Sequence, residues 1–157
     1  MSNRIFQVQK ALLAEINRYE NAVPHRDASP DWERLHLASC GRLGYLLAEE
    51  RGLNPELAAI ACSCHDYGRI ITGRQEGHAE WGYQPVKEFL EKLGLFSSDE
   101  VEQIAIAVKN HSKKGEIHQP LDEVVKDADV LDFHQYGLEL PRQDQRNRLQ
   151  SLAKYTK

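Results

Sequence analysis

The sequence predicts an all-α protein, a single-domain helical bundle of about six to seven helices. Apolar residues recur at helical spacing almost throughout the chain, and two polar residues that precede prolines mark helix starts. No segment alternates apolar and polar residues in the way that a half-buried strand does. These observations leave helices as the only regular elements that the pattern supports.

The first three helices follow from apolar stripes and start signals. An amphipathic helix is predicted over residues 3–20, where apolar residues recur every three or four positions. Ser29 before Pro30 is a typical N-cap followed by a favoured first helical residue, and the second helix runs from there to near Gly52. Asn54 before Pro55 repeats this signal and opens a third helix that leads into His65-Asp66.

The second half of the chain continues in the same way after one interruption. The glycine-rich stretch YGRIITGRQEGH, residues 67–78, is predicted to break the helical pattern. The remaining helices are expected over residues 79–93, from the capping box at 97–100 to near His111, over 121–133 and over 142–155.

Length and charge restrict the classes of protein. The 157 residues suit one domain, 1–157, with a motif-bearing core over about 30–136 and the helices 3–20 and 142–155 as extensions. A net charge of −4 argues against a nucleic-acid polymer as the partner, and no apolar run is long enough to cross a membrane. The N-terminal residues MSNRIFQVQK lack the apolar stretch of a signal peptide, so a cytoplasmic location is expected. Three cysteines give no disulfide framework, which fits a reducing compartment. The sequence gives no basis for predicting an oligomeric state.

Histidines and carboxylates at helix ends or on inward faces form the candidate site. Helices that converge at one point can bring such side chains together, although they are far apart in the chain. Histidine and carboxylate ligands suit iron, manganese, zinc or nickel, and a carboxylate can bridge two ions. Two ions about 3.5–4 Å apart form a centre used for attack on phosphorus. The residues are His36, His65, Asp66, His78, His111 and Asp129.

The order of these residues resembles a known family. His36, then HDYG at 65–68, then Asp129 within KDADVLD, is similar to the HD superfamily of metal-dependent phosphohydrolases, named for its His-Asp doublet. The resemblance covers roughly residues 30–136 and implies a helical bundle of the HD-domain type. The segments EGHAEWG and KNHS look like the additional histidine motifs of members that bind two metals.

The resemblance implies a role for each ligand. His36, His65, Asp66 and Asp129 would hold a first divalent ion, Asp66 would bridge, and His78 and His111 would hold the second. The implied cofactors are two divalent metal ions, with iron or manganese favoured and nickel, zinc or magnesium also compatible. Asp66 would be catalytic together with a water bound to both ions. The three cysteines are expected to be buried small hydrophobic residues and not ligands.

Other charged residues near the ligands leave alternatives open. Asp132 shares a helical face with Asp129 and either competes for the ligand position or orients a ligand histidine. Asp127 is expected to face solvent. Arg69, Lys113 and Lys114 follow candidate ligands within three positions; they either contact phosphate oxygens in catalysis or are solvated loop charges.

The resulting functional prediction is a phosphohydrolase. It would act on a nucleotide or another small phosphate ester or anhydride through a metal-bound hydroxide. One alternative is a di-iron oxygenase of the HD type that oxidises a small polyol or phosphonate, because such enzymes use a similar ligand set. Another is a module that senses a nucleotide without catalysis.

Overall fold

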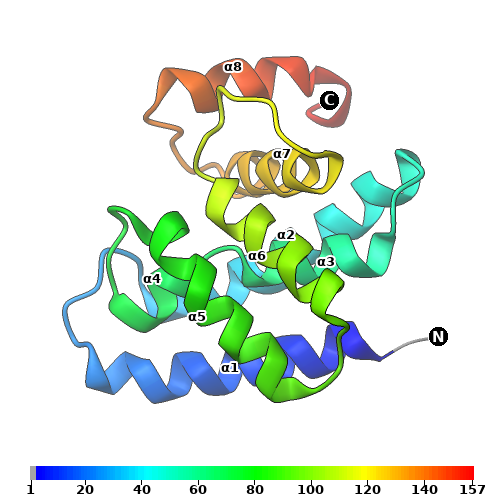
Figure 1. Ribbon diagram of the computed structural model, residues 1–157. Coiled ribbons are helices and arrows are strands. Elements are labelled where there is room, and N and C mark those ends of the chain that lie inside the picture. The colour runs from blue at the N-terminus through cyan, green and yellow to red at the C-terminus, as the bar shows by residue number, and fades with distance from the viewer. Residues whose placement is uncertain (1–2) are drawn as a thin grey trace.

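The computed structural model describes residues 3–157, and within this range every regular element is a helix (Figure 1). The predicted all-α class is therefore confirmed. The elements are α1 (Arg4–Ala22), α2 (Pro30–Glu50), α3 (Pro55–Cys64), α4 (Tyr67–Thr72), α5 (His78–Leu93), α6 (Ser98–Asn110), α7 (Pro120–Gln135), α8 (Gln143–Ser151) and the short 3-10 helix η1 (Ala153–Tyr155).

Three helices begin at the capping residues that the sequence indicates. The Ser29 side chain accepts a hydrogen bond from the backbone N–H of Trp32 at the start of α2. Asn54 accepts one from Leu57 in the same way at the start of α3. Ser97 and Glu100 form both bonds of a capping box at α6. Each cap satisfies an N–H that has no partner inside the helix, which fixes where the helix starts.

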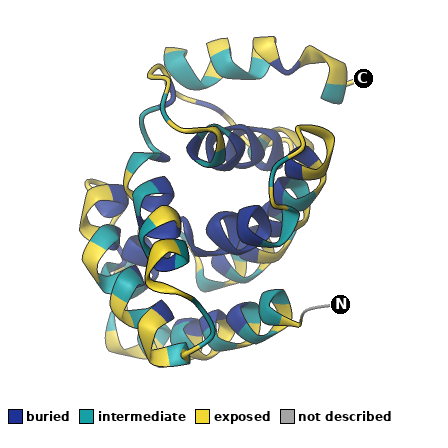
Figure 2. Cartoon of the chain, turned by 45° about the vertical axis from the view of Figure 1, so that its right-hand side comes forward, coloured by how far each residue is buried: buried dark blue, intermediate teal, exposed yellow. Residues whose placement is uncertain are grey.

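Helix α3 lies at the centre of the bundle. Its residues Leu57 to Cys64 are all buried, and the dark central ribbons of Figure 2 contrast with the exposed outer faces. Helix α2 packs closely on it because two of its glycines leave room. A Cβ at Gly44 would lie 2.3 Å from the sulfur of Cys62, and one at Gly41 would lie 2.5 Å from Oγ of Ser63. Bulkier residues at these positions would push α2 away from the core.

The glycine-rich segment after His65-Asp66 differs from the prediction. Its first six residues form α4, with Ile70 buried, and only the following residues are a loop. Gly73 and Gly77, at φ values of +74° and +70°, turn the chain between α4 and α5 in a conformation that suits glycine. Gly68 touches the start of α5 so closely that a Cβ there would lie 2.1 Å from the carbonyl oxygen of His78. This contact brings the first turn of α5 next to Asp66.

The C-terminal helix α8 packs on α7, at the top of the view in Figure 1. It corrects the expectation that Asp127 faces solvent. Asp127 is buried, with Oδ1 2.8 Å from Nη1 of Arg148 on α8 and Oδ2 2.7 Å from Nη2 of Arg51. The helical position of Asp127 does point away from Asp129, but α8 and the end of α2 cover that face of α7.

Across residues 3–157, none of the helices combines the length and the apolar composition that crossing a membrane would require.

The contact at Gly68 predicts a strong effect of a single methyl group. Gly68→Ala should lower the free energy of unfolding by about 2 kcal/mol or more, because a backbone carbonyl cannot move aside as a flexible side chain would. Urea unfolding followed by circular dichroism measures the change. Gly115→Ala is the matched control, since its Cβ would meet only the Cβ of Asp144 at an ordinary 3.5 Å. Equal stability of the two variants would contradict the proposed close packing of α4 on α5.

Candidate metal centre

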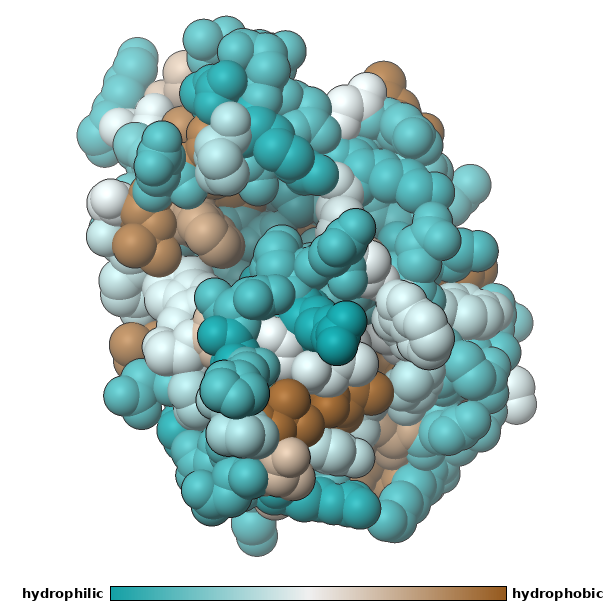
Figure 3. Space-filling view, turned by 90° about the vertical axis from the view of Figure 1, so that its left-hand side faces the viewer, coloured by the Kyte–Doolittle hydropathy of each residue, from teal (hydrophilic) through white to brown (hydrophobic). Residues whose placement is uncertain are grey.

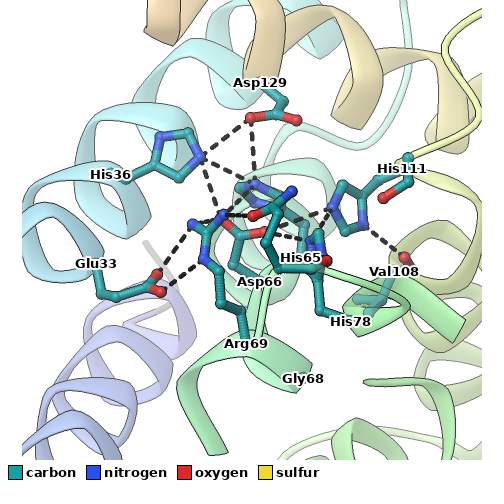
Figure 4. A network of polar contacts seen from close by, with 12 residues as sticks. Glu33, His36, His65, Asp66, Gly68, Arg69, His78, Val108, His111 and Asp129 are labelled. Atoms are coloured by element: carbon teal, nitrogen blue, oxygen red, sulfur yellow. Dashed lines mark hydrogen bonds and ion pairs between the residues drawn. The ribbon is translucent and has the colours of Figure 1, made fainter. Parts of the chain in front are cut away.

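Six side chains from four helices and the α3–α4 junction meet in the interior of the bundle (Figure 4). All six are buried, and most stand at helix ends, where the side chain can point along the axis of its helix into the space between the helices. They are His36 in α2, His65 at the C-cap of α3, Asp66 at the N-cap of α4, His78 at the start of α5, His111 at the C-cap of α6 and Asp129 in α7. These are the residues that the sequence singled out as ligands.

Four of these side chains form a first set around one point. The Nε2 atoms of His36 and His65 are 3.0 Å apart. Oδ2 of Asp66 lies 3.4 Å from Nε2 of His36 and 3.2 Å from Nε2 of His65. Oδ1 of Asp129 lies 3.1 Å and 3.4 Å from the same two nitrogens. Ligand atoms about 2.0–2.2 Å from one ion lie roughly 3 Å from each other, so the spacing of this set fits a transition metal.

The other two histidines form a second set on the opposite oxygen of Asp66. Nε2 of His78 lies 3.0 Å from Oδ1 of Asp66, and Nε2 of His111 lies 3.5 Å from it. The two imidazole nitrogens are 3.0 Å apart. Figure 4 shows Asp66 between the two groups of histidines. Its carboxylate therefore presents one oxygen to each set, which is the arrangement of a bridging ligand.

Hydrogen bonds on the far side of each ring fix the histidine tautomers. Every Nδ1 faces an oxygen acceptor at 2.5–2.7 Å, so Nδ1 is the nitrogen that donates and Nε2 is left to act as a ligand. Within each set the Nε2 lone pairs would then face each other at 3.0 Å, an arrangement that a cation between them would stabilise. The donor set thus fits metal ions. The acceptors are Asp132 for His36 and the carbonyl oxygens of Cys62, Gln75 and Val108 for His65, His78 and His111.

The charged groups buried around the site keep the carboxyl groups of Asp66 and Asp129 ionised, and the two carboxylates attract positive charge. Burial raises the pKa of Asp66, but Arg69 and His65 outweigh it and hold that pKa well below its usual range. For Asp129 burial is likewise outweighed, by Lys114 and His65. Burial lowers the pKa of His65, yet the neighbouring carboxylates raise it further than burial lowers it. The first set therefore stabilises a cation, whether a proton or a metal ion.

The second set differs from the first in the charge of its imidazoles, because the pKa of His111 is lowered and not raised. Burial, together with nearby cationic groups, lowers the pKa of His111 to about 3 despite its hydrogen bond with Asp66. His111 is thus a neutral imidazole at ordinary pH, which is the form that binds metals.

Three cationic residues are predicted near the site, and two of them, Arg69 and Lys114, form ion pairs with its carboxylates. Arg69 is buried, and its Nη2 donates to Oδ2 of Asp66, while its Nε donates to Glu33 at 2.7 Å. Lys114 is also buried and donates to Oδ2 of Asp129 at 2.6 Å. Lys113 lies at the surface, 3.7 Å from Glu80, and does not line the cavity beside the ligands.

The open alternative for Asp132 is decided by geometry. Asp132 is fully buried, and its Oδ2 accepts from Nδ1 of His36 at 2.6 Å and from the Ser39 hydroxyl at 2.8 Å. It orients a histidine, whereas Asp129 faces the first set. Sequence reasoning missed Glu33, which holds Arg69. Its only signal in the sequence was its position three residues before His36, on the same helical face.

The cysteines are free thiols in the core, as expected. The sulfur of Cys40 falls within 4.8 Å of a ring nitrogen of His36 and of His65. Burial raises the pKa of Cys40 and of Cys64 well above the usual value, so both remain protonated thiols, which are poor metal ligands.

A cavity of about 360 Å³ opens beside the six residues. Figure 3 looks onto the largely hydrophilic side of the molecule that bears the α4–α5 loop and the start of α8. The wall of the cavity includes residues 141, 142 and 145 of the C-terminal segment, which the sequence did not predict to lie near the site. Its lining residues are Asp66, Arg69, Gln75, Glu76, Gly77, His78, His111, Ser112, Lys114, Asp129, Phe133, Pro141, Arg142 and Gln145.

Comparison with solved structures finds a similar chain. It is the crystal structure of a predicted HD superfamily hydrolase from an uncultured Thermotogales bacterium, with a TM-score of 0.61 and 18% sequence identity. The similarity covers 95% of this chain and 87% of that chain. At this identity it shows a shared fold. A search of curated proteins finds no match.

Comparison with family models places the chain more specifically. The model of the HD domain matches residues 35–134, a span that contains all six clustered side chains and runs from α2 through most of α7. The match covers well over half of the sequence, and it agrees with the fold. The chain belongs to the HD domain family.

Proposed function

We propose that the protein is a metal-dependent phosphohydrolase that uses two divalent ions and acts on a nucleotide or another small phosphate ester or anhydride. The observation that carries the proposal is the position of the Asp66 carboxylate. One oxygen lies 3.2 Å from Nε2 of His65 and the other 3.0 Å from Nε2 of His78. A carboxylate shared in this way supports a centre of two ions rather than one.

The proposed ions would polarise a shared water and stabilise negative charge on the phosphoryl oxygens. The chain's own residues prepare the centre for them. Arg69 and Lys114 hold the ligand carboxylates ionised and in place through buried ion pairs. Asp132 fixes the ring of His36 through Nδ1, and backbone carbonyls fix the other three rings. Rigid, oriented ligands reduce the reorganisation that the reaction requires.

The cavity supports a small substrate. Its volume of about 360 Å³ is within the range of small-molecule sites. Polar groups converge on it from the α4–α5 loop, the segment after α6 and the start of α8. Such a lining suits a compact, anionic molecule better than a long polymer.

Metal stoichiometry tests the bridging role of Asp66. Asp66→Ala should lose nearly all bound metal, because both sets share this carboxylate. His78→Ala or His111→Ala should lower the content from about two ions per chain toward one, because only the second set is damaged. Metal analysis of protein purified without oxygen measures these values.

His25→Ala is the control, since this histidine is exposed in the loop before α2 and should not change the metal content. If both second-set variants kept the wild-type number of ions, His78 and His111 would be structural residues, and the centre would hold one ion.

The orienting role of Asp132 predicts a graded loss. Asp132→Ala should weaken metal binding by about 10–100-fold, because His36 would keep its ring but lose the acceptor that sets its orientation. Competition with a calibrated chelator measures the affinity. An affinity as low as that of His36→Ala would indicate that Asp132 is itself a ligand.

Oxygen-free phosphate release tests the reaction. The metal-loaded protein should hydrolyse at least one compound in a panel of nucleotides, sugar phosphates and dinucleoside polyphosphates, screened with manganese, iron, nickel and magnesium. Asp66→Ala should abolish this activity, while circular dichroism still reports a helical fold. Oxygen-dependent consumption of a polyol or phosphonate without phosphate-ester hydrolysis would instead identify an oxygenase, and silence in both assays would favour a sensing module.

A further inference from the structure

One wall of the cavity is formed by a segment that the family match does not include. Pro141, Arg142 and Gln145 line the cavity from the start of α8, whereas the HD domain match ends at residue 134. In Figure 1 this segment leaves α7 and passes along the left side before α8 begins. This part of the cavity wall is therefore built by residues outside the span of the family match.

The segment is firmly attached. Arg148 on α8 donates to the carbonyl of Lys114 at 2.8 Å and to Asp127 at 2.8 Å. Leu152, after α8, is buried against the core. Arg142 itself donates from Nη2 to the carbonyl of Ser112 at 2.8 Å, directly after His111. The guanidinium of Arg142 is thus positioned next to the second set of ligands.

The three cationic side chains that line the cavity differ in how deeply their carboxylate partners are buried. Arg69 and Lys114 are buried and paired with Asp66 and Asp129. Arg142 is 48% exposed, and its charged partner is Asp144 at 3.3 Å, a carboxylate that is itself 34% exposed. An ion pair so open to water contributes little, so an incoming anion can compete for Arg142.

We propose that Arg142 binds a phosphate group of the substrate, so that the C-terminal segment helps to determine which substrates are accepted. The proposal rests on the proposed phosphohydrolase function. A guanidinium has five N–H groups; one donates to Ser112, and the Nε group faces Asp144. The remaining groups suit the paired oxygens of a phosphate. The six candidate ligands would hold the ions, and Arg142 would neutralise phosphate oxygens at its side of the cavity.

A direct binding measurement tests the proposal with inorganic phosphate as the probe. Titration calorimetry of the metal-loaded protein should give about tenfold weaker binding for Arg142→Gln, because the charge and the paired donors are both lost. Arg142→Lys should lie between this variant and wild type, since it keeps the charge without the planar donors. Asp144→Asn should bind phosphate more tightly, because it removes the competing negative charge while keeping an oxygen that accepts from the backbone N–H of Gln145.

Kinetics on the best substrate from the phosphate-release panel provide a second measurement. Arg142→Gln should raise KM about tenfold and change kcat by less than twofold, while metal content and melting temperature stay at wild-type values. Arg18→Gln is the matched control, an exposed arginine on α1, and should leave KM and phosphate binding unchanged.

The outcomes separate this inference from the proposed function. Hydrolysis by wild type with the same KM and phosphate affinity in Arg142→Gln would overturn the role of Arg142 and leave the function standing. Phosphate binding that depends on Arg142, without hydrolysis of any compound, would support the anion site and contradict the phosphohydrolase. Loss of metal from Arg142→Gln, or no phosphate binding by wild type, would also overturn the inference.

Discussion

The structure depends on a carboxylate that is buried among four imidazoles. Asp66 is 5% exposed, and an ionised group at such a depth is stable only with compensating positive charge and hydrogen-bond donors. Arg69 supplies part of this charge within the chain, and Glu33 in turn holds Arg69. The two oxygens of Asp66 face two separate pairs of histidines. A cation at each pair would supply the further positive charge that the buried carboxylate requires. The metal chemistry that we propose follows from this requirement.

The packing of the helices serves the same centre. The candidate ligands at helix ends lie within a few ångströms of one another, which requires neighbouring helices to approach closely. Gly41 and Gly44 let α2 approach α3, and Gly68 lets α4 touch α5. These glycines keep His36 near His65 and His78 near Asp66, so small residues in the core have a direct consequence for the site.

Residues around the centre fall into two groups with different consequences. Arg69, Lys114 and Asp132 act on the candidate ligands, because each of them makes a buried polar contact with Asp66, Asp129 or His36. Arg142 keeps an exposed charge at the cavity and comes from a segment beyond the span of the family match. The six clustered residues thus lie within the span of the family match, while the C-terminal segment that we propose to contact the substrate lies outside it.

The sequence by itself determined the helical class, most helix starts and the six clustered residues. Caps and helical periodicity depend on neighbours a few positions apart, and the order of the histidines and aspartates is a property of the linear chain. The tertiary structure alone decided which oxygen of Asp66 faces which histidines, that Asp127 is covered by α8, and that Arg142 rather than Lys113 lines the cavity. These contacts join residues far apart in sequence, such as His36 and Asp132, 96 positions apart, and they exist only once the helices have packed.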